Sequence, residues 1–284
     1  MSRRGEQGIA MIIVLWGVTL LALLAAGLAG TSGLAARRMS HAIESAEAHA
    51  ALQKAAAAAE LALADGDPAK AWVPDGTRHL LTFDSFTAEV AASSEAGKID
   101  LNHAPPPLLK ALFQQAEPSE EEADRLFAAF SAWTMPGMGG RALLAVTELA
   151  ALPGITALVY RKLAGASTVH NPTGRLDWRL ANEATLSAIP GITEQARATL
   201  LARKGRKDYT PDPATAQAFA AAGITEGAAS PDPGTPLFVT LEISVRLPSA
   251  ATASGEALVR LAPREQRPVI LLEWHEPQWQ EEDR

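Results

Sequence analysis

A long apolar stretch near the N-terminus constrains the fold of this chain more than any other feature. From Ile9 to Ala36 no residue is charged, and the polar residues Thr19, Thr31 and Ser32 are the only interruptions. A bilayer core of about 30 Å requires roughly 20 helical residues, so the stretch is long enough to cross a membrane. We therefore expect a transmembrane helix over about residues 9–34.

A secretory signal peptide is the alternative interpretation of this stretch. Such signals have an apolar core of about 7–15 residues, followed by small residues at a cleavage site. Arg3 and Arg4 precede the stretch and small residues follow it, but its length favours a retained helix. Because a large soluble domain translocates regardless of small charge differences, we expect the short N-terminus to be cytoplasmic and the domain to lie outside the cytoplasm.

The helix is expected to continue beyond the membrane. Residues 37–64 are rich in Ala, Glu, Gln, Lys and Leu, and neither Gly nor Pro occurs before Gly66 and Pro68. The first group consists of strong helix formers, whereas Gly and Pro end helices. A helix over residues 9–66 would be about 85 Å long at roughly 1.5 Å per residue.

Composition restricts the possible functions. The chain has 284 residues, of which 48% are hydrophobic, and this suffices for an anchor and one or two globular units. The net charge of −7 argues against coating nucleic acid through overall charge. Without cysteine there is no disulfide, thiol catalysis or cysteine-bound zinc. The histidines form no HExxH pair and no serine lies in a GxSxG turn, so we expect no enzymatic activity.

The soluble part has strand patterns on both sides of a helical block. Polar and apolar residues alternate in HLLTF and SFTAEVAA, and again in PLFVTLEISVRLP, EALVRLAP and RPVILLEWHEP. Between these groups, Pro and Gly punctuate segments of helix-forming residues. We predict an α+β fold in which a pilin-like α/β core, residues 67–100 and 236–284, is interrupted by an all-helical inserted domain of residues 101–235.

The helical block contains a degenerate repeat. GKIDLNHAPPPLLKALF begins at Gly97, and GRLDWRLANEATLSAIP begins at Gly174. Both segments start with a glycine, a basic residue, an apolar residue and an aspartate. The alignment then places Ala104 opposite Ala181, as well as Leu109 opposite Leu186.

Two PGIT turns form a second, shorter repeat. ELAALPGIT begins at Glu148 and TLSAIPGIT at Thr185. Glycine permits a tight turn between two helices, and Thr156 or Thr193 can cap the second helix. DNA-binding helix-hairpin-helix units use a similar LPGIG turn, whose amides approach a phosphate. Threonine replaces the final glycine here, which disfavours DNA binding, although basic residues follow the second turn: Arg197, Arg203, Lys204, Arg206 and Lys207.

The N-terminus resembles the type IV pilin and pseudopilin class. Its leader MSRRGEQG is short and basic and ends in Gly8, and the apolar helix begins at Ile9. The resemblance implies a prepilin-type leader of residues 1–8, cleavage after Gly8 by prepilin peptidase and methylation of Ile9. Most members carry glutamate at the fifth mature position, where this chain has Ile13. An unpaired buried charge is costly, so Ile13 suits a first subunit at the tip of a fibre.

Most of the chain resembles the general secretion pathway protein K family, the large minor pseudopilins of type II secretion. The resemblance rests on IDLNHAPPPLLKALF, the two PGIT hairpins and the strand VILLEWHEP, in that order. It implies four kinds of partner: other minor pseudopilins, the major pseudopilin, the inner-membrane secretion platform and prepilin peptidase. It also implies that the helical domain binds calcium. The residues whose side-chain oxygens could bind this ion stand in no recognised spacing: Asp65, Asp67, Glu120, Glu121, Glu122 and Asp124.

The expected protein is therefore a non-enzymatic, single-pass inner-membrane subunit with a periplasmic C-terminal domain. As a minor pseudopilin it would initiate and cap the pseudopilus tip during export across the outer membrane. One alternative is a membrane-anchored helix-hairpin-helix DNA receptor of the competence type. Another is a generic anchored periplasmic binding domain.

Overall fold

The structure is a computed structural model that describes the backbone of residues 3–67, 69–134, 140–206, 209–224, 236–262 and 269–279. Within these ranges it describes no side chains for residues 3–10, 12–13, 24–37 and 276–279. The chain divides into two compact units, Met1–Ala51 and Leu52–Arg284. The first contains the N-terminal part of helix α1, and the second contains the rest of α1 together with all strands and the other helices.

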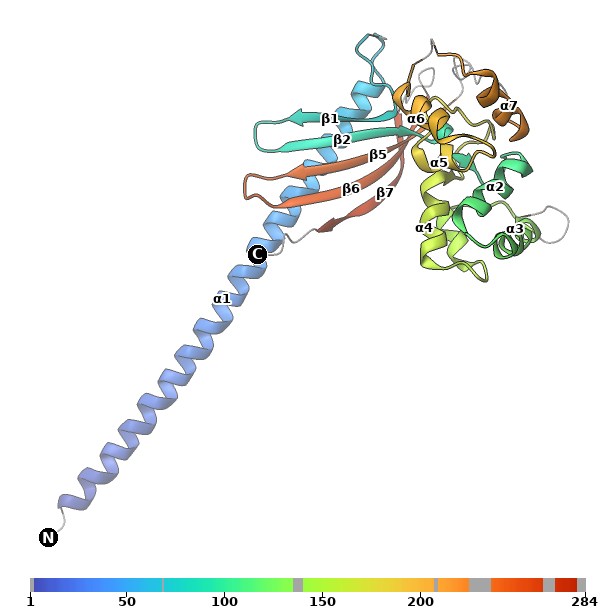
Figure 1. Cartoon of the computed structure of the whole chain (residues 1–284). Helices are drawn as coiled ribbons and strands as arrows, with labels where there is room; N and C mark the ends of the chain where they lie inside the picture. The colour runs from blue at the N-terminus through green and yellow to red at the C-terminus, as the bar shows by residue number, and fades with distance from the viewer. Residues whose placement is uncertain are drawn as a thin grey trace. The chain divides into compact units, whose positions relative to one another are not determined.

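Helix α1 runs without interruption from Arg3 to Leu63 (Figure 1). Beyond its last turn the chain bends, and the N–H of Asp67 donates to Oδ1 of Asp65 at 2.9 Å. The helix ends just before Gly66, where the loss of strong helix formers predicted its end.

Within the part of the chain that the structure describes, no helix is both long enough and apolar enough to cross a membrane. The transmembrane helix predicted over about residues 9–34 includes residues 9–10, 12–13 and 24–34, whose side chains lie outside those described. It stays a prediction.

The five predicted strand patterns form one antiparallel sheet with the order β1-β2-β5-β6-β7. The strands are β1 (Asp75–Thr82), β2 (Thr87–Ser94), β5 (Leu237–Arg246), β6 (Thr252–Leu261) and β7 (Val269–Trp279). Although residues 95–236 separate them in sequence, β2 and β5 are direct neighbours, paired from Thr87↔Arg246 to Ser94↔Val239. The segment between them is therefore inserted into a continuous sheet.

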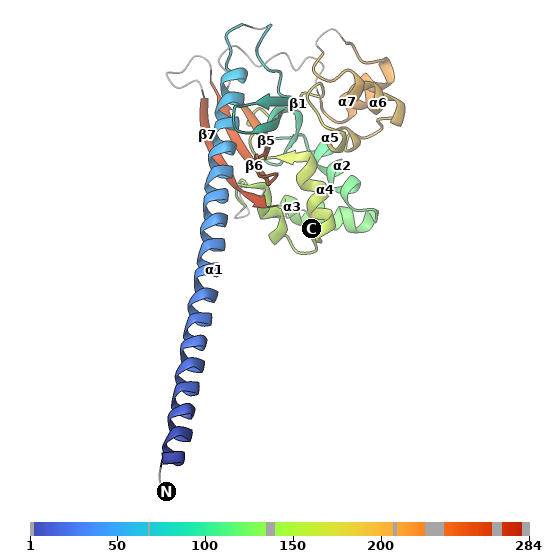
Figure 2. The ribbon, with the colours of Figure 1, turned by 90° about the vertical axis from the view of Figure 1, so that its left-hand side faces the viewer.

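One face of the sheet packs against the last turns of α1. Alternate residues of β5, including Leu241 and Ile243, are buried, as expected for a strand with one covered face. In these last turns Leu52, Ala55, Ala56 and Ala59 are buried, and the alanines let the helix approach closely. Gly255 of β6 faces the helix, because a Cβ placed on it would be in ordinary van der Waals contact with Cδ1 of Leu52, at 3.7 Å. Figure 2 shows these turns of α1 beside the strands.

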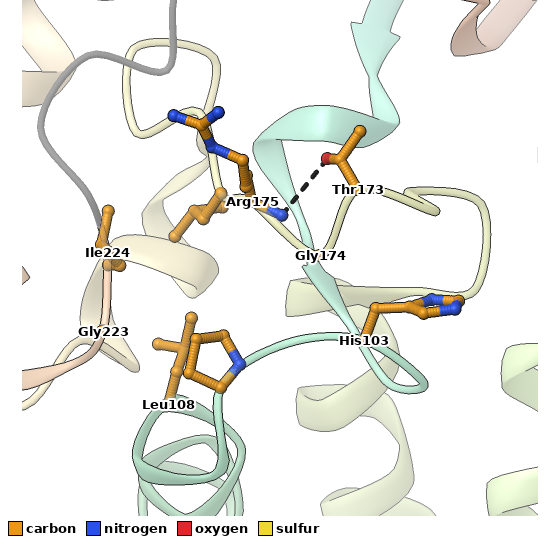
Figure 3. A pocket seen from close by; sticks show the side chains of 9 residues that line it. His103, Leu108, Thr173, Gly174, Arg175, Gly223 and Ile224 are labelled. Atoms are coloured by element: carbon orange, nitrogen blue, oxygen red, sulfur yellow. Dashed lines mark hydrogen bonds between the residues drawn. The ribbon is translucent and has the colours of Figure 1, made fainter.

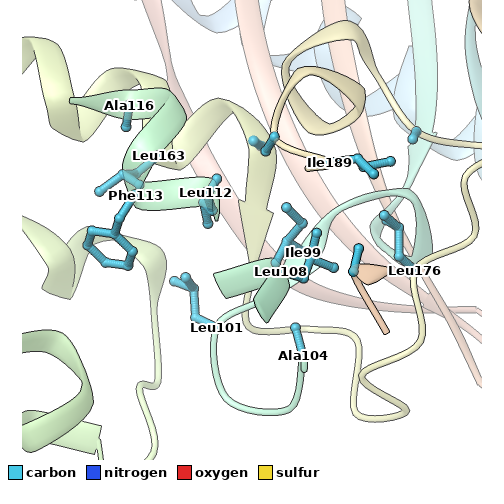
Figure 4. Close-up of a cluster of buried hydrophobic side chains, with 14 of the residues drawn as sticks. Ile99, Leu101, Ala104, Leu108, Leu112, Phe113, Ala116, Leu163, Leu176 and Ile189 are labelled. Atoms are coloured by element: carbon cyan, nitrogen blue, oxygen red, sulfur yellow. The ribbon is translucent and has the colours of Figure 1, made fainter. Parts of the chain in front are cut away.

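The inserted domain, which we define as the elements between β2 and β5, is mainly helical. Its α-helices are α2 (Pro106–Ala116), α3 (Glu120–Thr134), α4 (Ala157–Ala166), α5 (Glu183–Ser187), α6 (Glu194–Ala202) and α7 (Pro213–Ala221), and its 3₁₀ helices are η1 (Glu95–Gly97) and η2 (Val146–Ala151). Residues of both repeats share one apolar core, in which Ile99 and Leu176 lie close to Leu108 of α2 (Figure 4). Fully burying side chains of this size contributes about 1.5–3 kcal/mol each.

The inserted domain differs from the all-helical prediction in one respect. Ile99–Asp100 forms strand β3, which pairs in parallel with β4, Ser167–Thr168. Two residues are too few for an alternating pattern, so the sequence alone does not reveal them. The pairing joins the first repeat to the segment that follows α4.

Candidate functional site

The carboxylate of Asp100 lies at the centre of the inserted domain. The residue is 1% exposed at the end of β3. Its Oδ1 accepts the N–H groups of Asn102 and His103, each at 2.9 Å, and lies 2.9 Å from Nδ1 of His103. Its Oδ2 accepts the N–H of Asn171 at 2.9 Å. This buried charge is therefore satisfied internally, and it holds together two loops distant in sequence.

The two repeats contact each other closely at their first glycines. A Cβ placed on Gly97 would lie 2.4 Å from the carbonyl oxygen of Leu180, and one on Gly174 would lie 2.3 Å from that of His103. His103 and Leu180 occupy matching positions in the aligned repeats. Each repeat thus presents a glycine to the same carbonyl of the other, in a reciprocal contact that only residues without a side chain allow.

Asp177 matches Asp100 in the alignment and also fixes its own loop. Its Oδ1 accepts the N–H of Arg179 at 3.1 Å, and its carboxylate makes two further bonds with the guanidinium, at 2.9 and 3.1 Å. The N–H of Asp177 donates to the carbonyl of Ala96 at 2.8 Å. The repeat predicted from sequence is therefore a structural pair with equivalent aspartate turns.

A hollow of about 430 Å³ lies between the repeat loops (Figure 3). Its apolar lining includes Leu108, Leu176 and Ile224, which are buried, whereas Thr173 and Arg175 on its rim are exposed. The N–H of Arg175 donates to Oγ1 of Thr173 at 3.2 Å. This hollow is not evident from the sequence, because its lining comes from segments far apart in the chain.

The lining of the hollow suits an apolar group better than an anion. Helix α2 begins beside it, but Pro106 and Pro107 have no N–H to offer at that helix start. The ring of His103 points away from Leu108 and Ile224 in Figure 3 and contacts Asp100 instead. The hollow therefore lacks the converging donors of a phosphate or carboxylate site.

Both PGIT turns have the predicted local structure. Gly154 and Gly191 have φ of +91° and +74°, and each turn precedes a helix. Oγ1 of Thr156 accepts the N–H of Val159 at 3.2 Å, and Thr193 does the same for Ala196 at 3.1 Å, so both predicted caps are confirmed.

The surroundings of these turns are unsuited to a nucleic-acid backbone. A Cβ on Gly154 would lie 3.5 Å from Oε1 of Glu122, so a carboxylate lies beside the first turn. After the second turn, Arg197 pairs with Glu194 and also donates to Ser187 at 2.8 Å. The predicted basic cluster is thus partly neutralised within the chain, and Lys207 lies outside the described residues.

The calcium candidates are separated into local interactions. Asp67 pairs with Lys70 at 3.3 Å, Asp124 pairs with Lys110 at 3.1 Å, and Glu122 pairs with Arg125. Among the residues whose side chains are described, no three potential metal ligands lie close enough together to hold an ion. These acidic residues therefore do not fit a calcium site, and calcium stays a hypothesis from the resemblance.

The residues predicted to direct leader cleavage and methylation lie outside the part of the chain whose side chains are described. Gly8, Ile9 and Ile13 lie within the α1 backbone, but their side chains are outside those described. Cleavage after Gly8, methylation of Ile9 and a tip position marked by Ile13 therefore stay predictions. The absence of enzymatic activity also stays a prediction.

The architecture defines a class of fold. A long N-terminal helix whose end packs on an antiparallel sheet, with the first two strands separated from the last three by an inserted domain, is a pseudopilin-like arrangement.

A comparison with solved structures supports this class. The chain is similar to a chain in the crystal structure of the GspK-GspI-GspJ complex from the type 2 secretion system of enterotoxigenic Escherichia coli. The TM-score is 0.53 at 14% sequence identity, and the match covers 84% of this chain and 98% of the other. No model of a known protein family matches the sequence, and no characterised protein matches it. The similarity thus concerns the fold.

Proposed function

We propose that this protein is a minor pseudopilin of a type II secretion system, which initiates the periplasmic pseudopilus and caps its tip. The observation that carries the proposal is the inserted domain between β2 and β5 of a pseudopilin-like sheet, in a fold similar to a chain of the GspK-GspI-GspJ complex. Other minor pseudopilins are the partners that this similarity suggests.

A bulky inserted domain suits a tip subunit for steric reasons. Residues 95–236 add a helical body to a minimal sheet, and such a body would obstruct a further subunit above it. The apolar N-terminal part of α1 remains available to pack against other subunits. The domain can therefore terminate a fibre without preventing its growth from the base.

A membrane-anchored precursor is part of the same proposal. The apolar run begins directly after Gly8, and large apolar side chains of α1 such as Leu15, Trp16 and Leu23 are 66–72% exposed. Transfer of such side chains from water into lipid is favourable. We place residues 9–34 of α1 in the inner membrane, with the domain in the periplasm and Ile9 as the mature N-terminus.

The proposal is tested by assembly and secretion. In a strain without its native copy, the full-length protein should co-purify with the two smaller minor pseudopilins of the same host and restore secretion. A variant without residues 101–235 should still be inserted but should not restore secretion. Failure of the intact protein both to co-purify and to restore secretion would contradict the proposed function.

Position in the fibre is tested at Ile13. A carboxylate here has no preceding subunit to neutralise it in a tip protein, and an acid within the membrane costs up to about 2.5–3.5 kcal/mol, the value at the bilayer centre. Ile13→Glu should leave cleavage intact and should not improve initiation, whereas Ile13→Leu should behave as the parent. If Ile13→Glu instead entered the fibre shaft while secretion stayed normal, the tip position would be wrong.

A further inference from the structure

The inserted domain contacts the sheet at strands β1, β5 and β7, through residues that belong to one row across all five strands. The row is Asp75, Ser93, Thr240, Leu258 and Glu273, each opposite the next in antiparallel register. Side chains that are directly opposite in neighbouring strands lie on the same face of a sheet. The row therefore runs over one face from β1 to β7, which are the two edge strands of the sheet (Figure 1).

The central contact is formed by a buried carboxylate of the inserted domain. Glu95 of η1 is 3% exposed, and its Oε1 accepts a hydrogen bond from Oγ1 of Thr240 at 2.7 Å. The same oxygen lies 2.8 Å from Nζ of Lys98. A charged acceptor makes the Thr240 bond stronger than a bond between neutral groups. It connects the start of the inserted domain to the middle strand, β5.

A second contact lies at the β7 edge. Nε2 of His170, in the segment after β4, is 3.6 Å from Oε1 of Glu273. The His170 ring also stacks on Phe238 of β5, with the ring centres 6.0 Å apart. The inserted domain is thus held at two neighbouring places on this side of the sheet.

A third contact lies at the β1 edge, where the segment after α6 meets the start of β1. A Cβ on Gly205 would lie 2.7 Å from Oδ2 of Asp75, and one on Gly76 would lie 3.3 Å from Nζ of Lys204 and 3.2 Å from Oγ of Ser93. Burial lowers the pKa of Lys204, while the negative charge of Asp75 acts in the opposite direction. The lysine is therefore partly buried at this edge, close to Gly76.

We propose that this row is a seat that fixes the orientation of the inserted domain on the sheet. Contacts at both edges and at the centre prevent the domain from turning in the plane of the sheet, and directional polar contacts fix its position along the strands. The domain and the sheet then move as one rigid body. A rigid inserted domain can bear load during fibre growth, and this mechanical role rests on the proposed tip function. The seat itself does not depend on that function.

The seat is tested by a distance between two spin labels. The chain has no cysteine, so Leu80→Cys in β1 and Leu144→Cys in the inserted domain create two unique sites, which are 72% and 76% exposed. In the full-length protein, electron paramagnetic resonance should give one narrow distance distribution. In Asp75→Asn with Thr240→Val and Glu273→Gln, the distribution should become broad or split.

Controls separate the seat from general destabilisation. Thr87→Val makes the same change as Thr240→Val on an exposed β2 residue outside the row, and it should leave the distribution narrow. Thr240→Val and Glu273→Gln are also measured singly, so that a combined variant that fails to fold leaves two tests. An unchanged distribution in a folded combined variant would overturn the seat, as would unchanged distributions in both single variants if the combined variant does not fold. Equal broadening by Thr87→Val would overturn it as well. Normal distances with lost secretion would instead concern the proposed function.

Discussion

Glu148 holds the loop that precedes η2. Its Oε1 accepts the N–H of Leu144 at 2.7 Å and that of Ala145 at 3.2 Å, and Oε2 pairs with Arg141. The Leu144 bond, followed by the Arg141 pair, lowers the pKa of Glu148 below its ordinary value of 4.5. At pH values between the lowered pKa and 4.5, the unfolded chain binds more protons at Glu148 than the folded chain does. Ionised Glu148 therefore stabilises the fold fully above about pH 4.5, and this stabilisation is lost as the pH falls through the lowered pKa.

Glu148→Gln should lower the free energy of unfolding at pH 7, since glutamine keeps one acceptor oxygen but loses the charge. The difference from the parent should shrink as the pH falls through the lowered pKa, where Glu148 itself becomes protonated. Denaturant unfolding at a series of pH values measures this. Glu121→Gln, an exposed change in the first turn of α3, is the control and should show no comparable pH-dependent loss. A loss for Glu148→Gln that persisted unchanged in acid would contradict the explanation.

Gly8 decides the mature N-terminus if the leader is of the prepilin type. Cleavage between Gly8 and Ile9 would leave a chain that begins with Ile9, and methylation would add one methyl group to its amine. Mass spectrometry of membrane-extracted protein measures both. Gly8→Asp should leave the precursor uncut, whereas Gly5→Asp should be processed normally. A parent N-terminus at Met1, or one beyond Ala29, would contradict pilin-type processing.

At the scale of elements, the reciprocal glycine contact makes the two repeats dependent on each other. Gly97→Ala and Gly174→Ala should each destabilise the protein by at least the roughly 1–3 kcal/mol typical of overpacking. The reason is that each new Cβ would meet a backbone carbonyl at 2.4 or 2.3 Å, and Gly174 also has a φ of +62°. Thermal or denaturant unfolding of the purified variants measures the effect.

The double variant and a third glycine provide the controls. Once one substitution has separated the repeats, the second should cost less, so the two effects should not add. Gly165→Ala in α4 meets nothing closer than Ala184 Cβ at 4.0 Å and should be neutral or stabilising by up to about 1 kcal/mol. Strictly additive losses would mean that the two contacts are independent.

At the scale of the whole molecule, charge separates the proposed function from the DNA-receptor alternative. The net charge is −7, and the basic residues after the second PGIT turn include Arg197 and Lys204, which are engaged within the chain. We therefore expect no appreciable binding of duplex DNA near physiological salt. Fluorescence anisotropy with a labelled duplex measures this. Micromolar binding that weakened in Arg203→Ala with Lys204→Ala, and with added salt, would favour the competence alternative.

The sequence by itself determined those features that depend on neighbours within a few residues. The absence of glycine and proline from residues 37–64 predicted that α1 continues to just before Gly66, and alternation predicted the strands of the sheet. The Thr156 and Thr193 caps were predictable because each hydroxyl bonds an amide three residues ahead. The glycines and aspartates of the repeat were also found as a pattern.

Only the tertiary structure decided how these parts meet. The sequence aligned Gly97 with Gly174 but could not show that each touches the other repeat's carbonyl. Likewise, the row that joins Asp75 to Glu273 depends on strand register, and the hydrogen bond between Glu95 and Thr240 spans 145 positions. The physical reason is that local propensity acts over one or two turns of chain. Register and packing are set instead by which distant surfaces exclude water together.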